Sequence, residues 1–423
     1  MSPFCHDNPS ADRRLGEVKA QIPTPPLRRT QYERPRAQGV GEAVCGLARL
    51  NGGFSLLELM ASVAILMVIM AAIFSVISYY QKTYGTTALK ADMYENVRGV
   101  IELMAQEIGQ AGLVNLPPPP SSPTLSAAVI ASGTAQAVNV SSTTSMFVGE
   151  KLLVGTGASE ELVSVTALNT AANQMTGVFT KAHASGAPIN VLGVFHNGVM
   201  ASSTGTQLRL FGDINADGSL LYVHYDCDNS TTPGTLTRSV TTVTPSVSSS
   251  SAGQTLLSTL IANPGGTPCF QYTAQLPTSA QTLGTGNGAL TTFSGTVTPA
   301  PFSSGSLAVV AGSVFGLDNG SGSIVGTGVL SGTVNYTTGA VSVTFGAAPA
   351  NGTAVQVGQS YITNVAVTLS VRTTQVDPQT KAYLTMTKSF LNLTPRNILA
   401  GLELANVPFT DRLQPRPPNL PLP

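Results

Sequence analysis

Charged residues are scarce in this chain. Only 10% of its 423 residues are Asp, Glu, Lys or Arg, and its 21 basic and 21 acidic residues give a formal net charge of zero. A protein that binds nucleic acid needs a basic face to neutralise phosphates. The composition therefore predicts that nucleic acid is not among the partners.

Recognisable catalytic motifs are lacking as well. Beyond residue 53 the histidines are His183, His196 and His224, and none is accompanied by a nucleophile elbow, a paired-histidine helix or a phosphate-binding glycine loop. The 42 glycines suit turns rather than a ligand loop. We therefore expect a protein that is not an enzyme. A hydrolase assembled from distant residues is the alternative, since triads are defined by geometry rather than by order.

One long segment holds almost no charge. Between Phe54 and Ile77 the only formal charge is Glu58, and the apolar run continues to Tyr80. A run of roughly 24 residues is long enough for a helix to cross the hydrocarbon core of a membrane. An unpaired charge in lipid is costly. Residues 54–80 are therefore predicted to span the membrane, with Glu58 either near the interface or matched by a partner charge.

The start of this run resembles the class III signal of type IV prepilins and their pseudopilin relatives. That signal is a glycine, then Phe or Met, then Ser/Thr-Leu-x-Glu opening an apolar helix, and every position is present from Gly53 to Glu58. The resemblance implies that a prepilin peptidase in the membrane cuts after Gly53 and methylates the new amino terminus, Phe54. It also implies that Glu58 pairs with a terminal amine when subunits assemble.

The physical chemistry of a cut after Gly53 agrees with this resemblance. The cut creates an ammonium group one helical turn from Glu58. Two opposite charges at that spacing neutralise each other, which lowers the free-energy cost of holding both in lipid. The alternative interpretation is an ordinary signal anchor in which the glutamate is incidental.

Residues 1–53 are predicted to be a cytoplasmic leader that is removed. They hold eight of the 21 Lys and Arg residues, scattered prolines and no apolar run, a composition typical of unfolded segments. Positive charge beside a membrane span keeps that end in the cytoplasm. We therefore expect a single-pass protein with its amino terminus inside, and the prepilin resemblance implies an inner-membrane precursor that moves to a pilus at the cell surface after assembly.

The predicted helix covers residues 54–116 and so continues beyond the membrane. No proline occurs between Phe54 and Leu116, and the run from Pro117 to Pro120 then ends any helix. Apolar residues with the spacing of one helical face are Leu89, Met93, Val97, Val100, Ile101, Met104 and Ile108. This half is expected to pack on a globular domain, with Gly85 as a flexible point before it. Residues 100–112 resemble the end of this helix in minor pilins of the PilW kind.

The remaining chain is rich in short Val- and Thr-containing strands separated by Gly, Asn and Pro turns. This pattern predicts an α+β fold, in which the long helix packs on an antiparallel pilin-like sheet and all-β modules are inserted. The expected boundaries are an inserted β module at 124–195, the first part of the sheet at 196–279, a second inserted module at 280–360, the closing strands at 361–398, and a C-terminal tail at 399–423 that is mobile from Pro415.

Four cysteines are present, and Cys5 and Cys45 lie in the leader. Only Cys227 and Cys269 remain in the exported part, and a pair of cysteines in an oxidising compartment predicts one disulfide. Two buried free thiols are the alternative. A zinc site is disfavoured, because no histidine pair lies near these cysteines.

The segment from Asp213 to Gly218 has the opening pattern of a calcium loop. Oxygen-bearing side chains occupy alternate positions, at Asp213, Asn215 and Asp217, and glycine stands where the turn is sharpest. The closing acid is missing, because His224 stands at the twelfth position. A polar hairpin turn is the favoured interpretation, and calcium is the alternative. No other cofactor is expected.

These features together predict a minor pilin-like structural subunit. It would be processed by prepilin peptidase and would enter a type IV pilus, or its tip or priming complex, by packing its helix among the helices of other pilins. A pseudopilin of a type II secretion system is one alternative, since it shares the motif and the helix. An adhesin displayed on the filament, with its β modules binding a surface or ligand, is the other.

Overall fold

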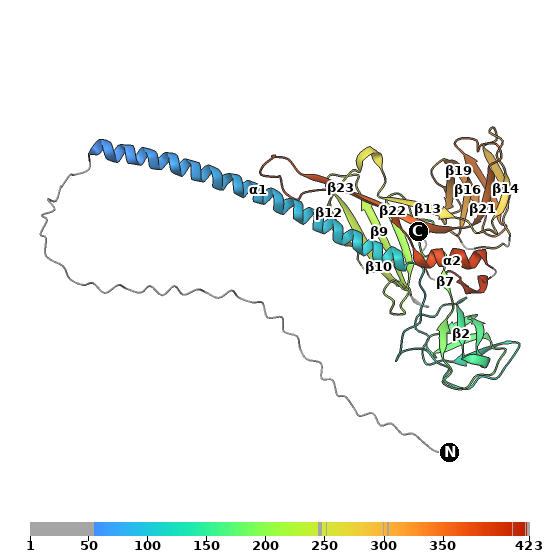
Figure 1. Cartoon of the computed structure of the whole chain (residues 1–423). Coiled ribbons are helices and arrows are strands. Elements are labelled where there is room, and N and C mark those ends of the chain that lie inside the picture. The colour runs from blue at the N-terminus through green and yellow to red at the C-terminus, as the bar shows by residue number, and fades with distance from the viewer. Residues whose placement is uncertain are drawn as a thin grey trace, which may run out of the picture. The chain divides into compact units, whose positions relative to one another are not determined.

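The computed structural model describes residues 55–420 apart from 244–247, 251, 299, 303, 408 and 419 (Figure 1). The expected leader, Gly53 and Phe54 lie outside the described residues. Two compact units divide the chain, Met1–Ile69 and Met70–Pro423. The α+β class is confirmed, because one long apolar helix accompanies many antiparallel sheets.

Helix α1 runs over Leu56–Gln110 without a proline and ends before the expected residue 116. The reason is Gly112, which has a left-handed φ of +83° and donates its N–H to the Phe211 carbonyl at 2.9 Å. A Cβ at Gly112 would come within 2.6 Å of the Phe195 carbonyl oxygen. Only glycine therefore allows the chain to turn here.

The largest sheet has eight antiparallel strands in the order β13-β22-β12-β10-β9-β8, with β11 paired to β10 and β23 paired to β22. It combines strands from two distant parts of the chain. The strands are β8 (Gln207–Gly212), β9 (Leu221–Asp228), β10 (Gly234–Val243), β11 (Ser248–Ser250), β12 (Gln254–Ile261), β13 (Phe270–Gln275), β22 (Tyr361–Arg372) and β23 (Thr385–Leu393). A short 3-10 turn, η2 (Pro264–Gly266), separates β12 from β13.

The C-terminal half of α1 packs on this sheet, along β9, β10 and β12 (Figure 1). Its buried apolar residues recur at the three-and-four spacing of one helical face: Val97, Val100, Ile101, Met104 and Ile108. They join one core with alternate residues of the strands, among them Leu210, Val223, Leu236, Leu257 and Val367. Burying this face provides most of the stabilisation of the second half of the helix, since apolar area removed from water is the dominant favourable contribution to folding.

Residues 124–195 hold two three-stranded sheets around a separate core. One has the order β1-β5-β4 and the other β3-β2-β6. The elements are β1 (Ala135–Asn139), β2 (Lys151–Val154), the 3-10 turn η1 (Gly157–Ser159), β3 (Glu161–Ser164), β4 (Ala167–Asn169), β5 (Gln174–Val178) and β6 (Ile189–Val191). Leu125, Leu152, Met175 and Phe179 lie in this core.

Residues 280–360 also form two sheets with their own core. A five-stranded sheet has the order β14-β21-β16-β17-β18, and a three-stranded sheet has the order β15-β20-β19. The strands are β14 (Gln281–Thr285), β15 (Thr292–Thr296), β16 (Leu307–Ala311), β17 (Val314–Asp318), β18 (Ile324–Val325), β19 (Val329–Val334), β20 (Ala340–Phe345) and β21 (Ala354–Gln359). Phe293, Val309, Val343 and Val357 pack between the sheets.

The C-terminal segment is not the tail expected at 399–423. Residues Arg396–Asn406 form helix α2, which buries Ile398 and Leu402 in the core of the large sheet. The 3-10 turn η3 (Thr410–Arg412) leads into β24 (Leu413–Gln414), which pairs in parallel with β7 (Val194–Phe195). Leu420 is also buried, so this described residue beyond Pro415 packs against the protein. The closing strands, expected at 361–398, therefore end at Leu393, and helix α2 begins at Arg396.

Candidate functional site

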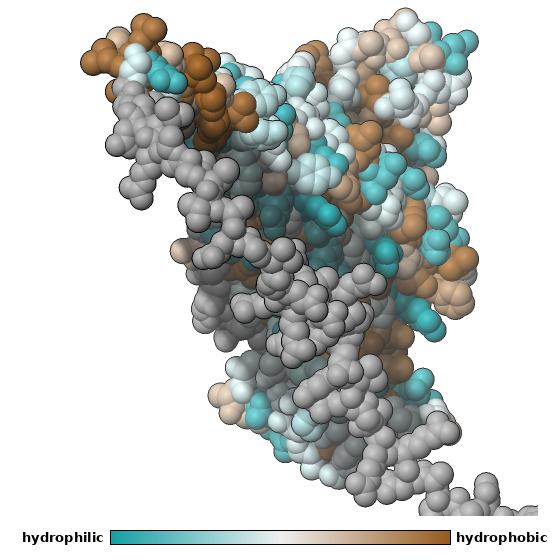
Figure 2. All heavy atoms as spheres, turned by 60° about the vertical axis from the view of Figure 1, so that its left-hand side comes forward, coloured by the Kyte–Doolittle hydropathy of each residue, from teal (hydrophilic) through white to brown (hydrophobic). Residues whose placement is uncertain are grey.

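The first half of α1 exposes a nearly continuous apolar surface, drawn in brown in Figure 2. Leu56 and Leu57 are 76% and 78% exposed, and the exposed large apolar side chains continue to Tyr84. α1 is the one helix in the described part of the chain that is long and apolar enough to cross a membrane. Exposed area of this kind marks a surface that lipid or other protein covers.

Glu58 lies on the first turn of this apolar helix and is its one acidic residue there. Its own N–H donates to the Ser55 carbonyl at 2.9 Å, so the helix is already formed at this point. Because Gly53 and Phe54 lie outside the described residues, the pairing of Glu58 with a terminal amine stays a prediction.

The half of α1 that packs on the sheet carries a buried charge, Glu107. Its side chain accepts hydrogen bonds from both Nε and Nη2 of Arg238 on β10 and from the hydroxyl of Tyr225 on β9. Glu107 is only 5% exposed. Sequence reasoning missed this cluster, although a signal was present, because Glu107 lies one residue from Ile108 and three from Met104 on the apolar face.

The electrostatics of this cluster favour the ion pair. Burial raises the pKa of the Tyr225 phenol, and the neighbouring Glu107 carboxylate raises it further, so Tyr225 is a neutral donor. Burial lowers the pKa of Arg238, but its hydrogen bonds and charge interaction with Glu107 outweigh burial and leave that pKa above its ordinary value. A carboxylate with a bidentate guanidinium and a phenol donor is satisfied in the interior. The three side chains therefore fix the register of α1 on β9 and β10.

A second polar contact holds α1 near the expected flexible point. The helix is continuous through Gly85, and the Pro378 ring lies 3.1 Å from where a Cβ of Gly85 would be. The next residue, Thr86, donates its hydroxyl to the Asp377 carboxylate in the loop between β22 and β23. This bond, with one from Thr380, holds the pKa of Asp377 below its ordinary value. Gly85 is thus a close-packing position in this fold.

A disulfide joins Cys227 at the end of β9 to Cys269 just before β13. The two Cα atoms are 6.5 Å apart, and both residues are almost fully buried. The loop that it closes contains β10, β11 and β12, which are three strands of the sheet that carries α1. The bond therefore ties the ends of the segment that supplies Arg238.

Removing this disulfide should destabilise the sheet. For a sequence separation of 42 residues, the chain-entropy model predicts a loss of about 3 to 4 kcal/mol in the free energy of unfolding for a variant with both Cys227→Ser and Cys269→Ser. Urea unfolding of the full chain in non-ionic detergent measures it. Reductant should lower the midpoint of the wild type and leave the double variant unchanged. A wild type that is insensitive to full reduction would contradict the prediction.

The segment expected as a turn or calcium loop has its carboxylates engaged by N–H donors. Asp213 is fully buried, and its oxygens accept from the N–H groups of Asp217 and Gly218 and from the side-chain amide of Asn115, each at 3.0 Å. Asp217 accepts from Ser219 N–H at 2.8 Å. In the described part of the chain, no group of three or more His, Cys, Asp or Glu side chains could hold a metal ion. The geometry favours the polar turn.

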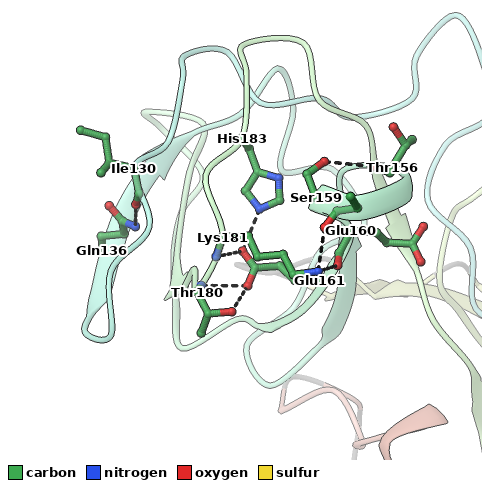
Figure 3. Close-up of polar contacts among 10 residues, drawn as sticks. Ile130, Gln136, Thr156, Ser159, Glu160, Glu161, Thr180, Lys181 and His183 are labelled. Atoms are coloured by element: carbon green, nitrogen blue, oxygen red, sulfur yellow. Dashed lines mark hydrogen bonds and ion pairs between the residues drawn. The ribbon is translucent and has the colours of Figure 1, made fainter.

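Another buried carboxylate orders the module at 124–195 (Figure 3). Glu161 accepts from the N–H and hydroxyl of Thr180, from Lys181 N–H at 3.0 Å, and from the His183 ring at 2.7 Å. Burial alone raises the pKa of Glu161, but the bonds from Thr180, His183 and Lys181 outweigh it and leave this pKa lowered. The Lys181 ammonium donates to the carbonyls of Ala158 and Glu160. The cluster joins η1 and the start of β3 to the segment that follows β5.

One comparison with known proteins bears on the apolar helix. Residues 48–74 match the family described as Prokaryotic N-terminal methylation motif. This match supports a type IV pilin-like protein. No curated protein and no solved structure matches the chain.

In a pilin-like chain, the match indicates that the apolar half of α1 serves in membrane anchoring and assembly. The motif implies processing by prepilin peptidase and assembly with other pilins, and its family is structural rather than enzymatic. With the long apolar helix, it supports a membrane-anchored precursor that later enters a pilus. The site of this protein is therefore α1 itself, with one exposed apolar half and one half fixed to the sheet.

Proposed function

We propose that this chain is a minor pilin-like structural subunit of the PilW kind, cut after Gly53 and methylated at Phe54. The observation that carries the proposal is the division of α1. Its exposed apolar half overlaps the match to the methylation motif at residues 48–74, and its other half is fixed to a folded domain by Glu107. A subunit built this way can pack its exposed half among like helices in a filament while it displays the β modules outside.

Two other functions share parts of this support. A pseudopilin of a type II secretion system would carry the same motif and helix. A filament-displayed adhesin would use the separate cores at 124–195 and 280–360 as binding modules. The minor-pilin role is favoured over the pseudopilin, because two extra β modules add surface that a displayed subunit can use.

Processing is the first testable consequence. Mass spectrometry of protein recovered from membranes and from sheared filaments should find a peptide that begins at N-methylated Phe54. The same peptide should be missing from a strain without prepilin peptidase. Gly53→Leu provides the matched variant, because a bulky residue at the cleavage position should block the cut and leave the helix unchanged. An intact leader, or a cut elsewhere, would contradict the proposal.

The adhesin alternative is tested by deleting residues 280–360, which have a core of their own and also contribute Ala308 and Leu317 to the core of the large sheet. Filaments that are intact but no longer adhere would support the adhesin. Loss of filaments would support a role in assembly. The N-terminal peptide should be the same in either case, because processing precedes both.

A further inference from the structure

The loop between β22 and β23 meets α1 where the apolar half of the helix ends. The Thr86 hydroxyl donates to the Asp377 carboxylate, and the Pro378 ring lies 3.1 Å from where a Cβ of Gly85 would be. Figure 1 shows this end of the hairpin beside the middle of α1. The exposed large apolar side chains of the first half of α1 continue to Tyr84. The loop therefore lies level with the last of them.

Residues 376–383 form the hairpin tip, which hydrogen bonds hold in one conformation. The Asp377 carboxylate accepts from the N–H of Thr380 at 2.8 Å and from its hydroxyl at 2.7 Å. The Asp377 N–H donates to the Ala382 carbonyl at 2.9 Å, and the Lys381 N–H donates to the Asp377 carbonyl at the same distance. The carboxylate is thereby engaged within the protein, and the hairpin tip is a preformed surface.

The exposed side chains of the hairpin tip combine apolar groups with a cation. Val376 and Tyr383 are both exposed, and Lys381 is exposed between them. The guanidinium of Arg372 lies 4.3 Å from the centre of the Tyr383 ring, which stabilises the ring in this position. Such side chains suit the boundary between water and hydrocarbon, because an aromatic ring lies at headgroup level there and a lysine reaches the phosphates.

The adjoining turns of α1 present the same kinds of side chain. Tyr79, Tyr80 and Tyr84 are all exposed. Lys82 is exposed as well, and it lies one helical turn before Thr86, on the helical face that meets the hairpin tip. Tyrosines around a helix at the end of an apolar run are typical of a membrane interface. Both α1 and the hairpin tip therefore carry interfacial side chains at the same level.

We propose that the hairpin tip lies on the membrane surface, with Lys82 and Lys381 at the headgroups of anionic phospholipids and Tyr383 in the interfacial layer. The inference rests on the proposed function in one respect, since it needs α1 to cross the membrane. A span that ends at Tyr80 places Thr86 about 9 Å beyond the hydrocarbon core. The headgroup layer is about 5 to 8 Å thick on each side, so the helix meets the hairpin tip at the outer edge of that layer.

The charges on this face favour anionic lipid. Lys82 and Lys381 are exposed, whereas the Asp377 carboxylate is buried and engaged by the bonds described above. The next acidic residue along α1, Asp92, lies about 9 Å beyond Thr86, which is further from the membrane. An anionic bilayer attracts a lysine within about a Debye length of its surface. The two lysines are therefore placed to bind lipid phosphates.

Tryptophan fluorescence tests this contact, because the chain contains no tryptophan and each single substitution reports one position. The full chain is reconstituted in vesicles of phosphatidylcholine and phosphatidylglycerol, with and without bromine on the acyl chains of the phosphatidylcholine. Bromine quenches tryptophan on contact. Tyr383→Trp and Val376→Trp should both be quenched. Ile130→Trp, at an exposed position in the module at 124–195, should not be quenched.

Phe74→Trp, at an exposed position in the apolar half of α1, separates this inference from the proposed function. If Phe74→Trp is quenched and neither Tyr383→Trp nor Val376→Trp is, the inference is overturned, the membrane span stands, and a neighbouring subunit becomes the occupant of the hairpin tip. An unquenched Phe74→Trp would contradict the span and the inference together. Quenching of Ile130→Trp equal to that of Tyr383→Trp would also overturn the inference, because the contact would not belong to the hairpin tip.

Charge variants test the contact with the headgroups. In the Tyr383→Trp background, Lys82→Gln and Lys381→Gln should each lower the ratio of lipid-bound to free hairpin tip about fivefold. Vesicles of phosphatidylcholine alone should lower it at least as much as both substitutions together. Arg98→Gln removes an exposed cation about 18 Å beyond Thr86 along α1, more than a Debye length away, and should have no effect. The same ratio in anionic and neutral vesicles would overturn the assignment of lipid phosphate.

Discussion

Replacing Arg238 with methionine should lower the free energy of unfolding by about 3 to 5 kcal/mol. The variant leaves the Glu107 carboxylate buried between α1 and the sheet, where the Tyr225 hydroxyl is the one remaining side-chain donor among the described residues. An uncompensated charge in the interior is far more costly than the loss of one surface contact. Urea unfolding of the full chain in non-ionic detergent, followed by circular dichroism, measures the change.

The same helix offers a matched control. Arg98 and Glu102 form an ion pair at 2.6 Å, but their side chains are 66% and 61% exposed. Arg98→Met should therefore cost at most about 1 kcal/mol. The double variant Glu107→Leu with Arg238→Met should recover most of the stability lost in Arg238→Met, because it removes both buried charges. Equal losses for Arg98→Met and Arg238→Met would show that Glu107 is not held as a buried charge.

The apolar face of α1 could be read from the sequence because it depends on local spacing alone. Val97, Val100, Ile101, Met104 and Ile108 were predicted to pack and are buried. The partners of Glu107 were not predictable, because Tyr225 and Arg238 lie more than a hundred residues away and only the pairing of β9 with β10 brings them under the helix. A charge on an apolar face indicates that a partner exists, and it does not identify that partner.

For the C-terminal segment, the sequence-based prediction was wrong even where the signal was local. Ile398 was expected in the closing strands and Leu402 in the tail, but they lie four residues apart on α2 and are buried in the core of the sheet. A four-residue spacing of this kind is a local helical signal. The two-residue pairing of β24 with β7 was not visible, because so short a parallel contact has no sequence pattern.

Replacing Glu58 with leucine should leave processing intact and reduce entry into filaments about a hundredfold or more. The physical reason is the amine that the proposed cut would form at Phe54. In a lipid or helix-packed environment, a cation that loses its carboxylate partner costs about 3 kcal/mol, which corresponds to about a hundredfold in equilibrium. Quantitative mass spectrometry of the Phe54 peptide in membrane and sheared-filament fractions measures the ratio.

Membrane insertion cannot explain such a loss, because removing a carboxylate makes the apolar helix easier to insert, not harder. Glu95→Leu is the control, since this residue is exposed in the second half of α1, outside the most apolar part of the helix. It should enter filaments normally. Glu58→Asp keeps the charge on a shorter side chain. Its entry into filaments should be intermediate between that of Glu58→Leu and that of Glu95→Leu. If Glu58→Leu were cut, methylated and found in filaments at the wild-type ratio, Glu58 would have no part in assembly, and α1 would enter the filament by apolar packing alone.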